Sequence, residues 1–415
     1  MKILFFTDHF KPEPSAPAAH VYERAQMWSR LGHDVTVLCG APNFPEGKVY
    51  AGYKNKWRFV EYMDGVRVVR VKTFIARNEG FVLRIIDYIS YMLSSFINSL
   101  FEKKPDVVIS TSPHLFVPMA GVACSIVKRV PHVFELRDLW PASIASVVKI
   151  KPGLFYRMLE RLELFLYKKS KRILSFTRSF AEDLVSRGVS RDKIDVVLGG
   201  ANLKLFSRRS RDRSIEDMHG LCGRFVVGYL GTMGLAHGLE NVLKTAEILK
   251  NSNAVFLFVG VGAAKLSLEM MARDHGLSNV VFVSRQLKEN MPGYWSVCDA
   301  ALIHLRDQEV FTKVVPSKIF EAMAMGLPII YAGPAGEGSS IVERHGAGVW
   351  VPPDNPQALA GAVMSLSLDE RRCAEFADNS FSSACNYSRE RQAEGTLSVL
   401  QKAIDDEKSG VDFAV

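Results

Sequence analysis

The stretch 225–243, FVVGYLGTMGLAHGLENVL, changes from an apolar run to a helical pattern across a segment with three glycines. The run 225–230 predicts a buried strand, and the residues after Gly238 predict a helix. Glycine lets backbone amides approach a ligand closely, and a helix N-terminus favours an anion. We therefore expect a strand, a ligand-binding loop and a helix here. Taken alone, the segment is explained equally well by a plain turn between strand and helix.

Apolar runs alternate with helical patterns along most of the chain. Apolar strands separated by helices are typical of parallel sheets that are buried on both faces. A polar segment, 207–220, separates one series from a second, so we predict an α/β fold with two Rossmann-like domains. The predicted strands cover residues 2–8, 34–40, 66–71, 106–111, 132–136, 172–176, 194–200, 225–231, 255–260, 280–284, 300–305 and 328–333.

These two series set the predicted domain boundaries. We expect an N-terminal domain at 1–205, a second domain at 206–385, and a helical segment, 386–415, that returns to the first domain. The 415 residues are too many for one ordinary core, and 48% hydrophobic with 23% charged residues is typical of a globular protein. The net charge of +8 favours an anionic partner without distinguishing nucleic acid, membrane and phosphorylated ligand.

The cysteines and the apolar segments favour a cytoplasmic location. Six cysteines occur without a CxxC spacing, which fits reduced thiols better than a disulfide framework or a metal site. The first residues lack the long apolar region of a signal peptide. The longest apolar segment, 81–101, is interrupted by Arg84 and Asp87, so it does not cross a bilayer easily.

The second domain carries ligand-binding signals at two strand ends. The loop 231–238 differs from the GxGxxG pattern, and no acid follows about 20 residues later to hold a dinucleotide ribose, so NAD is disfavoured. The end of strand 280–284 carries Arg285 and Gln286. Arg285 is suited to a phosphate, although loop arginines are more commonly solvated.

A third signal comes from 314–330, VVPSKIFEAMAMGLPII. Pro316 suits the first position of a short helix, and Gly326 suits its end. Ser317 and Glu321 then share one face, although an acid near a helix start can simply complement the dipole. Together the three signals converge on a diphosphate and its sugar.

Several segments resemble one known family. GTMGLAHG (231–238) and PSKIFEAMAMGLP (316–328) are similar to retaining glycosyltransferases of family 4, which have the GT-B fold. The segments 16–53, 63–71 and 134–144 resemble more narrowly the bacterial surface-polysaccharide transferases of the WbuB type, which act on O-antigen, capsule or exopolysaccharide. The resemblance covers nearly the whole chain.

The resemblance implies roles for individual residues. Glu321 would be the second glutamate of the E-x7-E pattern, which holds the ribose hydroxyls of a nucleotide-sugar donor, expected to be UDP-linked. Lys318 would lie beside the diphosphate with a catalytic role. The other donor-binding residues would be Gly231, Thr232, His237, Gly238, Arg285, Gln286 and Ser317.

The sequence departs from the family pattern at two places. Lys313 stands where the family has the first glutamate, which contacts the donor sugar, so a neutral or N-acylated deoxy sugar fits better. In the N-terminal loop, Ser15, Ala16 and Ala18 replace a glycine pair on the acceptor side.

Cations and oriented amides can stabilise a leaving nucleoside diphosphate without metal. No DxD-type cluster occurs, so we expect no metal and no other cofactor.

Retention in this fold is ascribed to front-face attack, with the donor phosphate as base. FELRDLWP (134–141) suggests Glu135 and Asp138 as catalytic residues facing a cleft, although Arg137 paired with an acid in a structural network is the alternative. His9 and His114 are further acceptor-side candidates.

A polyprenyl-diphosphate-linked or saccharide acceptor is expected, with peripheral attachment to the inner leaflet. Segment 81–101 is one candidate contact, and the basic residues within 168–172 are another. A core helix with a solvated basic end is the alternative for the second.

Two other functions remain open: a sugar-nucleotide 2-epimerase and a non-catalytic binding subunit. Nucleic acid is disfavoured, because no aromatic–basic interleaving or known module appears.

Overall fold

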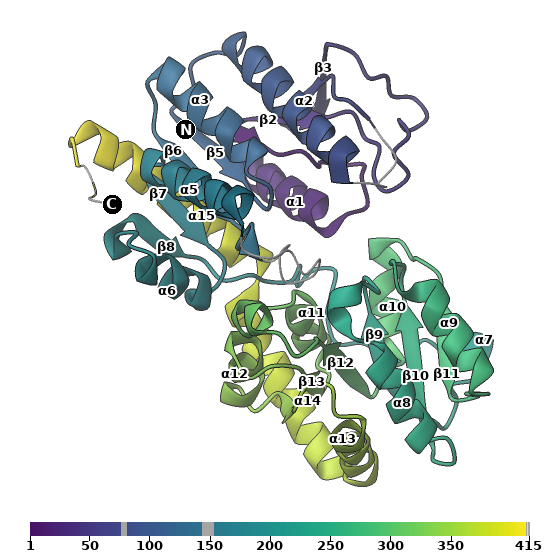
Figure 1. The fold of residues 1–415 in the computed structure, drawn as a ribbon. Helices are drawn as coiled ribbons and strands as arrows, with labels where there is room; N and C mark the ends of the chain where they lie inside the picture. Colours follow the sequence, from purple (N-terminus) through teal and green to yellow (C-terminus); the bar gives the residue numbers. More distant parts are fainter. Residues whose placement is uncertain (76–80, 143–152, 412, 414–415) are drawn as a thin grey trace. The chain divides into compact units, whose positions relative to one another are not determined.

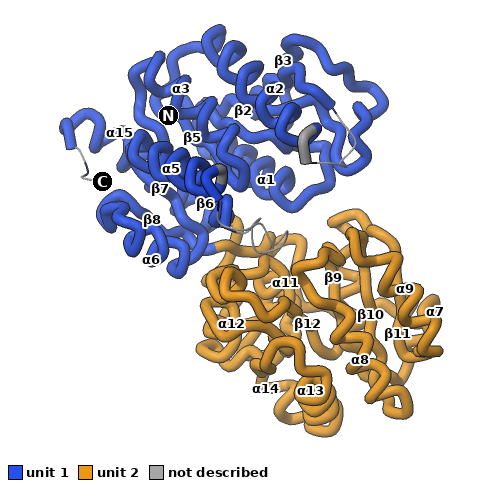
Figure 2. Tube along the Cα trace, viewed as in Figure 1, with its two compact units in different colours: residues 1–198, 390–415 blue, residues 199–389 orange. Residues whose placement is uncertain are grey.

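The computed structural model describes residues 1–75, 81–142, 153–411 and 413, without the side chains of 81, 82 and 155. The chain forms two compact units, each with its own sheet (Figure 2). Unit 1 comprises 1–198 and 390–415, and unit 2 comprises 199–389. The predicted boundaries after 205 and 385 lie a few residues from these divisions.

Unit 1 contains an eight-stranded sheet with the order β3-β4-β2-β1-β5-β6-β7-β8. Every neighbouring pair is parallel except β3 and β4, which form an antiparallel hairpin. The strands are β1 Lys2–Phe6, β2 Asp34–Gly40, β3 Arg58–Met63, β4 Val66–Val71, β5 Val107–Thr111, β6 His132–Leu136, β7 Arg172–Ser175 and β8 Ile194–Val196.

Helices cover both faces of this sheet (Figure 1). The alternation of side chains along β1 sends Ile3 and Phe5 into a core with α1 and α15, and Leu4 and Phe6 into a core with α2 and α3. The helices are α1 Ala16–Arg30, α2 Phe81–Leu100, α3 Phe116–Lys128, α5 Leu154–Lys169, α6 Arg178–Ser186 and α15 Arg389–Lys408, with the short η1 Arg191–Lys193.

Helix α15 belongs to unit 1 although it follows unit 2 in the sequence. The indole Nε1 of Trp28 in α1 donates to the carbonyl of Ala393 at 3.0 Å, and both groups are buried. Arg172 of β7 pairs with Asp406 at 2.6 Å. The end of the chain therefore completes the core of the first unit.

Unit 2 contains a six-stranded parallel sheet with the order β11-β10-β9-β12-β13-β14. Its strands are β9 Phe225–Leu230, β10 Ala254–Val259, β11 Val280–Val283, β12 Ala300–His304, β13 Ile329–Ala332 and β14 Gly348–Val351. Its helices are α7 Arg213–His219, α8 Glu240–Ile248, α9 Lys265–Asp274, α10 Met291–Ser296, α11 Lys318–Met325, α12 Glu337–Arg344, α13 Pro356–Leu368 and α14 Glu370–Ala384, with short η2 Leu235–His237, η3 Lys288–Asn290, η4 Glu309–Lys313 and η5 Cys385–Tyr387.

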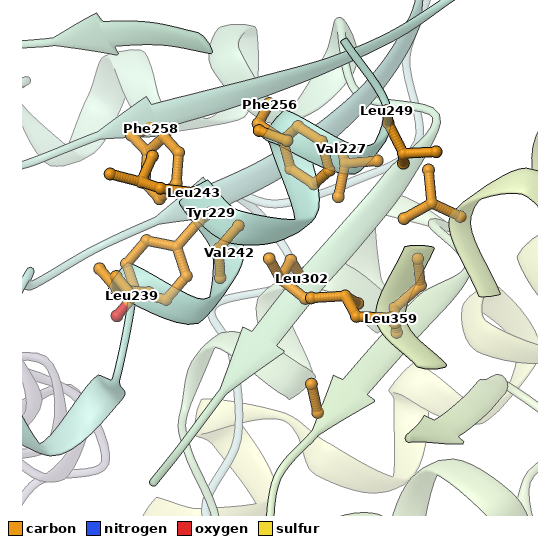
Figure 3. Close-up of a cluster of buried hydrophobic side chains, with 14 of the residues drawn as sticks. Val227, Tyr229, Leu239, Val242, Leu243, Leu249, Phe256, Phe258, Leu302 and Leu359 are labelled. Atoms are coloured by element: carbon orange, nitrogen blue, oxygen red, sulfur yellow. The ribbon is translucent and has the colours of Figure 1, made fainter. Parts of the chain in front are cut away.

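The main core of unit 2 lies between this sheet and helices α8, α9 and α13. Figure 3 shows Tyr229, Phe256 and Phe258 of the central strands together with apolar side chains of α8. Burying side chains of this size contributes about 1.5–3 kcal/mol each. This packing fixes the end of β9, from which the glycine loop starts.

Both sheets change winding direction beside their first strand. β1 has β2 on one side and β5 on the other, and β9 lies between β10 and β12. Ligands of open α/β sheets bind at such switch points, outside the carboxyl ends of the strands. Each unit therefore has one position where its topology favours a binding site.

The structure confirms the α/β fold with two Rossmann-like domains. β3 and β14 were not predicted from the sequence, and Pro316 precedes α11 instead of occupying its first position. Among the described residues, no helix has both the length and the apolar character needed to cross a membrane.

Candidate active site

The loop after β9 is built around a close backbone contact. Gly260, directly after β10, has φ of +147°, and a Cβ there would lie 2.1 Å from the carbonyl oxygen of Gly231. Gly231 itself has φ of +137°, so both positions require glycine. A Cβ on Gly231 would lie 3.4 Å from Lys318 Nζ. The predicted loop and the start of α11 are therefore adjacent.

Lys318 is the first residue of α11, and it brings a cation to this loop. Its Nζ lies 3.7 Å from the centre of the Tyr229 ring. Burial lowers the pKa of Lys318 from 10.5 to about 7, while Glu321 opposes the shift. An anionic ligand beside the ammonium group would favour its charged form, so this lysine is suited to a diphosphate.

His237 and His304 join the glycine loop to the end of β12. Nδ1 of His304 donates to the carbonyl of His237 at 2.6 Å, and His237 Nδ1 lies 3.4 Å from the carbonyl of His304. Burial, with a smaller contribution from Lys318, lowers the pKa of His237 to about 3. His237 is therefore neutral at pH 7, and its Nε2 is the nitrogen suited to accept a hydrogen bond.

Gly238 ends this loop in the left-handed conformation, with φ of +56°. A Cβ there would lie 3.0 Å from Cγ of Arg306 and 3.3 Å from Cε1 of His304. The exposed Thr232 accepts a 2.7 Å hydrogen bond from Tyr229 through its carbonyl oxygen. Thr232, His237 and Gly238 thus lie in the segment after β9, at the switch point of unit 2.

Glu321 lies one turn into α11, on the same face as the N-cap residue Ser317. Burial raises the pKa of Glu321, and the cations Lys288, Arg389 and Lys318 oppose this rise. Glu321 is half-buried among cations, whereas an acid that only complements a helix dipole is commonly exposed to solvent.

Arg285 and Gln286 follow β11, the edge strand, which β10 separates from β9. Both are half-buried, and Gln286 Nε2 donates to the carbonyl of Ser284 at 3.3 Å. They share the carboxyl edge of the sheet with the glycine loop. Lys313 ends η4 and is half-buried.

Glu135 does not match its predicted position. Its carboxylate is fully buried at the end of β6 and pairs with Arg24 of α1 and with Arg137, the latter at 2.7 Å. Burial would raise the pKa of Glu135, but the two arginines lower it overall. The expectation that Glu135 faces an open cleft is wrong, because these arginines hold it in an enclosed network.

The other residues predicted for unit 1 lie in different segments of the chain. Asp138 is half-buried after β6, and residues 143 and 144 of the segment 134–144 lie outside the described residues. Ser15 is the N-cap of α1, where its hydroxyl accepts from the amide of Ala18 at 3.3 Å, and Ala16 is exposed. The Ser15 hydroxyl thus caps the helix.

His9 and His114 are linked by Asp8, which was not among the residues predicted from the sequence. Asp8, two residues after the end of β1, accepts from Nε2 of His114 at 2.8 Å and lies 3.5 Å from Nε2 of His9. Nδ1 of His9 donates to Glu13 at 2.7 Å. Burial would lower the pKa of His9, but Asp8 and Glu13 raise it to about 9. The position of Asp8 at the carboxyl end of the predicted strand 2–8 was the available signal.

Within the described ranges, no group of three or more His, Cys, Asp or Glu side chains is arranged to hold a metal ion. At the switch point of unit 2, Lys318 brings a cation to the Gly231 end of the loop, and the side chain of Arg306 lies beside Gly238.

Family models match both units. Residues 210–382 match the model of glycosyl transferases group 1, and residues 18–205 match Glycosyltransferase Family 4. The protein is a glycosyltransferase. Both the fold and the enzyme class expected from the sequence are thereby confirmed.

Two bacterial proteins are similar to the glycosyltransferase in sequence. It is 24% identical over 381 residues to WcaI of Escherichia coli strain K12, named for colanic acid biosynthesis, with 89% of this chain and 92% of WcaI covered. It is 30% identical over 271 residues to WbjE of Pseudomonas aeruginosa, named as a glycosyltransferase, with 63% and 66% covered.

Solved structures agree on the GT-B fold. The Anabaena HepE structure in complex with UDP has a TM-score of 0.71 at 16% identity, covering 97% of the glycosyltransferase and 100% of HepE. WaaG, involved in lipopolysaccharide biosynthesis, has a TM-score of 0.70 at 16% identity, covering 96% and 99%.

Proposed function

We propose that the protein transfers a sugar from a UDP-linked donor to a lipid-linked or saccharide acceptor in bacterial surface-polysaccharide biosynthesis. Relatives named for colanic acid, teichuronic acid and amylovoran biosynthesis support this proposal. Solved HepE structures contain UDP and UDP-glucose, which supports a uridine donor. We further propose that the protein is a transferase of the WbuB type and that the transferred group is an N-acetylated deoxy sugar.

The contact between the Gly231 loop and Lys318 carries the proposal. A cation and a glycine loop at the switch point are suited to a diphosphate, whose negative charge grows as the bond to the sugar breaks. Glu321, one turn further along α11, is then suited to the ribose hydroxyls. Arg285 and Gln286, at the same edge of the sheet, are suited to the base and the diphosphate.

We infer a retaining transfer. The bond between the anomeric carbon and the diphosphate oxygen breaks, and a bond to the acceptor oxygen forms on the same face of the sugar. The acceptor proton moves to the leaving diphosphate, so no protein base is required. Lys318 and the loop amides stabilise the leaving group, and we expect the reaction to proceed without an added divalent metal.

Helix α2 supports peripheral attachment to a membrane. Its polar residues Ser94, Ser95, Asn98 and Ser99 are buried, whereas apolar residues at helical spacing face solvent. The exposed fractions of Leu93, Ile97 and Leu100 are 52%, 37% and 42%. An apolar stripe on a surface helix can enter the interface of a lipid leaflet.

A basic groove in the same unit fits anionic lipid. Lys168 and Lys169 at the end of α5 line a groove of about 620 Å³ together with Arg129 and Lys193. We therefore propose attachment at the inner face of the cytoplasmic membrane. Binding to anionic vesicles should be reversed by carbonate, and Leu93→Asp with Ile97→Asp should weaken it; no binding by the wild type would remove this part of the proposal.

A nucleotide panel tests the donor. We expect UDP to stabilise the protein more than ADP or GDP, since a ligand at 100 times its dissociation constant adds about 2.7 kcal/mol. An equal or larger shift with GDP would contradict a uridine donor. Product analysis without acceptor distinguishes transfer from epimerisation, and donor turnover above blank excludes a non-catalytic subunit.

A further inference from the structure

A cavity of about 90 Å³ lies at the carboxyl ends of β1 and β2, within unit 1. The first turns of α2 close it with Arg84, Asp87 and Tyr88, and the chain after β2 contributes Phe44. The space is large enough for several water molecules. Of the acceptor-side residues predicted from the sequence, His9 lines this cavity.

Asp87 is the carboxylate in this cavity with unused hydrogen-bonding capacity. Its side chain is half-buried and makes no hydrogen bond or ion pair with any residue in the described part of the chain. Asp8, by contrast, accepts from His114 and from the amide of His9. A carboxylate of this kind can accept hydrogen bonds from hydroxyl groups of a ligand.

His114 provides a second, independent observation. Its side chain is 5% exposed, and its Nδ1 has no partner among the residues that the structure describes. The ring stacks on Tyr88 with centroids 3.9 Å apart and is held by Asp8. His114 does not itself line the cavity, but it packs against two residues that do, Asp8 and Tyr88, so its unpartnered nitrogen lies behind the cavity wall and still calls for an explanation.

The remaining lining suits a sugar ring. Phe44 and Tyr88 offer aromatic surface, and Arg84 donates to the Tyr88 hydroxyl at 2.9 Å, which holds that ring. Ligand sites commonly combine apolar walls with a few placed polar groups. A pyranose presents the matching surface, because it has apolar C–H faces and hydroxyl edges.

We propose that this cavity binds the sugar ring of the acceptor, with Asp87 accepting a hydrogen bond from one of its hydroxyl groups. The inference rests on the proposed function, because it assumes an acceptor that carries a saccharide. Asp87 shares α2 with the exposed apolar stripe, so a lipid-linked sugar can occupy the cavity while its chain follows the same helix.

The test measures binding of methyl and octyl glycosides by saturation-transfer NMR on the full-length protein. Asp87→Asn keeps the shape of the side chain and should weaken glycoside binding roughly tenfold or more, because a charged hydrogen-bond acceptor is lost. Asp34→Asn is the matched control, since Asp34 is exposed at the opposite end of β2. Phe44→Leu, which removes aromatic surface without touching a charge, should also weaken binding.

The outcomes separate this inference from the proposed function. UDP affinity, measured on the same samples, should be equal in all variants; a wild type that binds no UDP would contradict the proposed donor independently. A preference for octyl over methyl glycosides indicates a lipid-linked acceptor, and equal binding indicates a free saccharide. No glycoside binding by the wild type, or equal binding by Asp87→Asn, would overturn the inference.

The pH dependence gives a second readout. Burial and Asp8 raise the pKa of Asp87 to about 6, opposed by His114 and His9, with Glu13 adding a small upward effect. Arg84 lines the same cavity. Glycoside affinity of the wild type should therefore fall as the pH is lowered from 8 to 5, and this fall should be absent in Asp87→Asn.

Discussion

The two switch points occupy equivalent positions in their sheets but carry opposite chemistry. In unit 2, the loop after β9 offers backbone amides and Lys318. In unit 1, the segment after β1 offers Asp8, which holds two histidines, and Asp87 lies across the cavity. Topology thus favours a ligand at both positions, and the side chains present suit an anion in unit 2 and a neutral hydroxyl compound in unit 1.

Removing the cation from unit 2 should have the largest effect. Lys318→Ala should lower kcat/KM for sugar transfer by about 10²–10³-fold, because a preorganised group that stabilises developing charge is lost. Steady-state kinetics with the donor measures this loss. Lys244→Ala, an exposed lysine on α8, is the control. Normal turnover in Lys318→Ala would contradict the proposal that the leaving diphosphate binds beside Lys318 in unit 2.

Glu321→Gln should have the next largest effect. It keeps the shape of the side chain but loses charge-assisted hydrogen bonds worth about 1.5–3 kcal/mol, so kcat/KM should fall roughly ten- to a hundredfold. The Tm should change little, since a helix-start acid contributes about 0.3–1 kcal/mol through the dipole. Unchanged UDP affinity, measured by calorimetry, would show that Glu321 serves only the helix.

The ion pairs of His9 in unit 1 should make the stability of the protein depend on pH. Burial lowers the pKa of His9, but Asp8 and Glu13 raise it overall from 6.5 to about 9. A raised pKa in the folded state stabilises fully below pH 6.5, and the stabilisation is lost as the pH rises through about 9. The Tm advantage of the wild type over His9→Gln should therefore shrink between pH 6 and pH 9.5. A constant advantage would mean that this ion pair contributes nothing.

Chelation should have the smallest effect, because we propose that Lys318 and the loop amides stabilise the leaving diphosphate without a metal ion. Transfer activity measured with and without EDTA should agree. If activity disappears with EDTA and returns only with a divalent ion, then a metal ion, and not Lys318, is the main cation of the donor site.

The sequence predicted most strands and the donor loop because their signals are local. Buried parallel strands are continuous apolar runs, and glycines mark the loop between a strand and a helix. β3 was missed because it is an exposed edge strand, antiparallel to β4, with polar residues between its apolar ones. β14 was missed because it has four residues and starts with glycine.

The acceptor side depends on contacts that sequence spacing does not reveal. Glu135 pairs with Arg24, which is 111 positions away, so its burial followed from tertiary packing alone. Asp87 interrupts an apolar segment, and this pattern indicated a surface helix without indicating which side chain faces a cavity. Asp8 bonds His114 across 106 positions for the same topological reason, since β1 and β5 are neighbours.

The return of α15 to unit 1 has a consequence for biosynthesis. The core around Trp28 lacks Ala393 and Leu400 until the ribosome has translated α15. Residues 199–389 form a continuous unit and can fold earlier. At about 5–20 residues per second, their synthesis takes roughly 10–40 s. During that time the nascent first unit exposes the apolar groove that α15 later fills, which makes this interval the natural moment for a chaperone to bind.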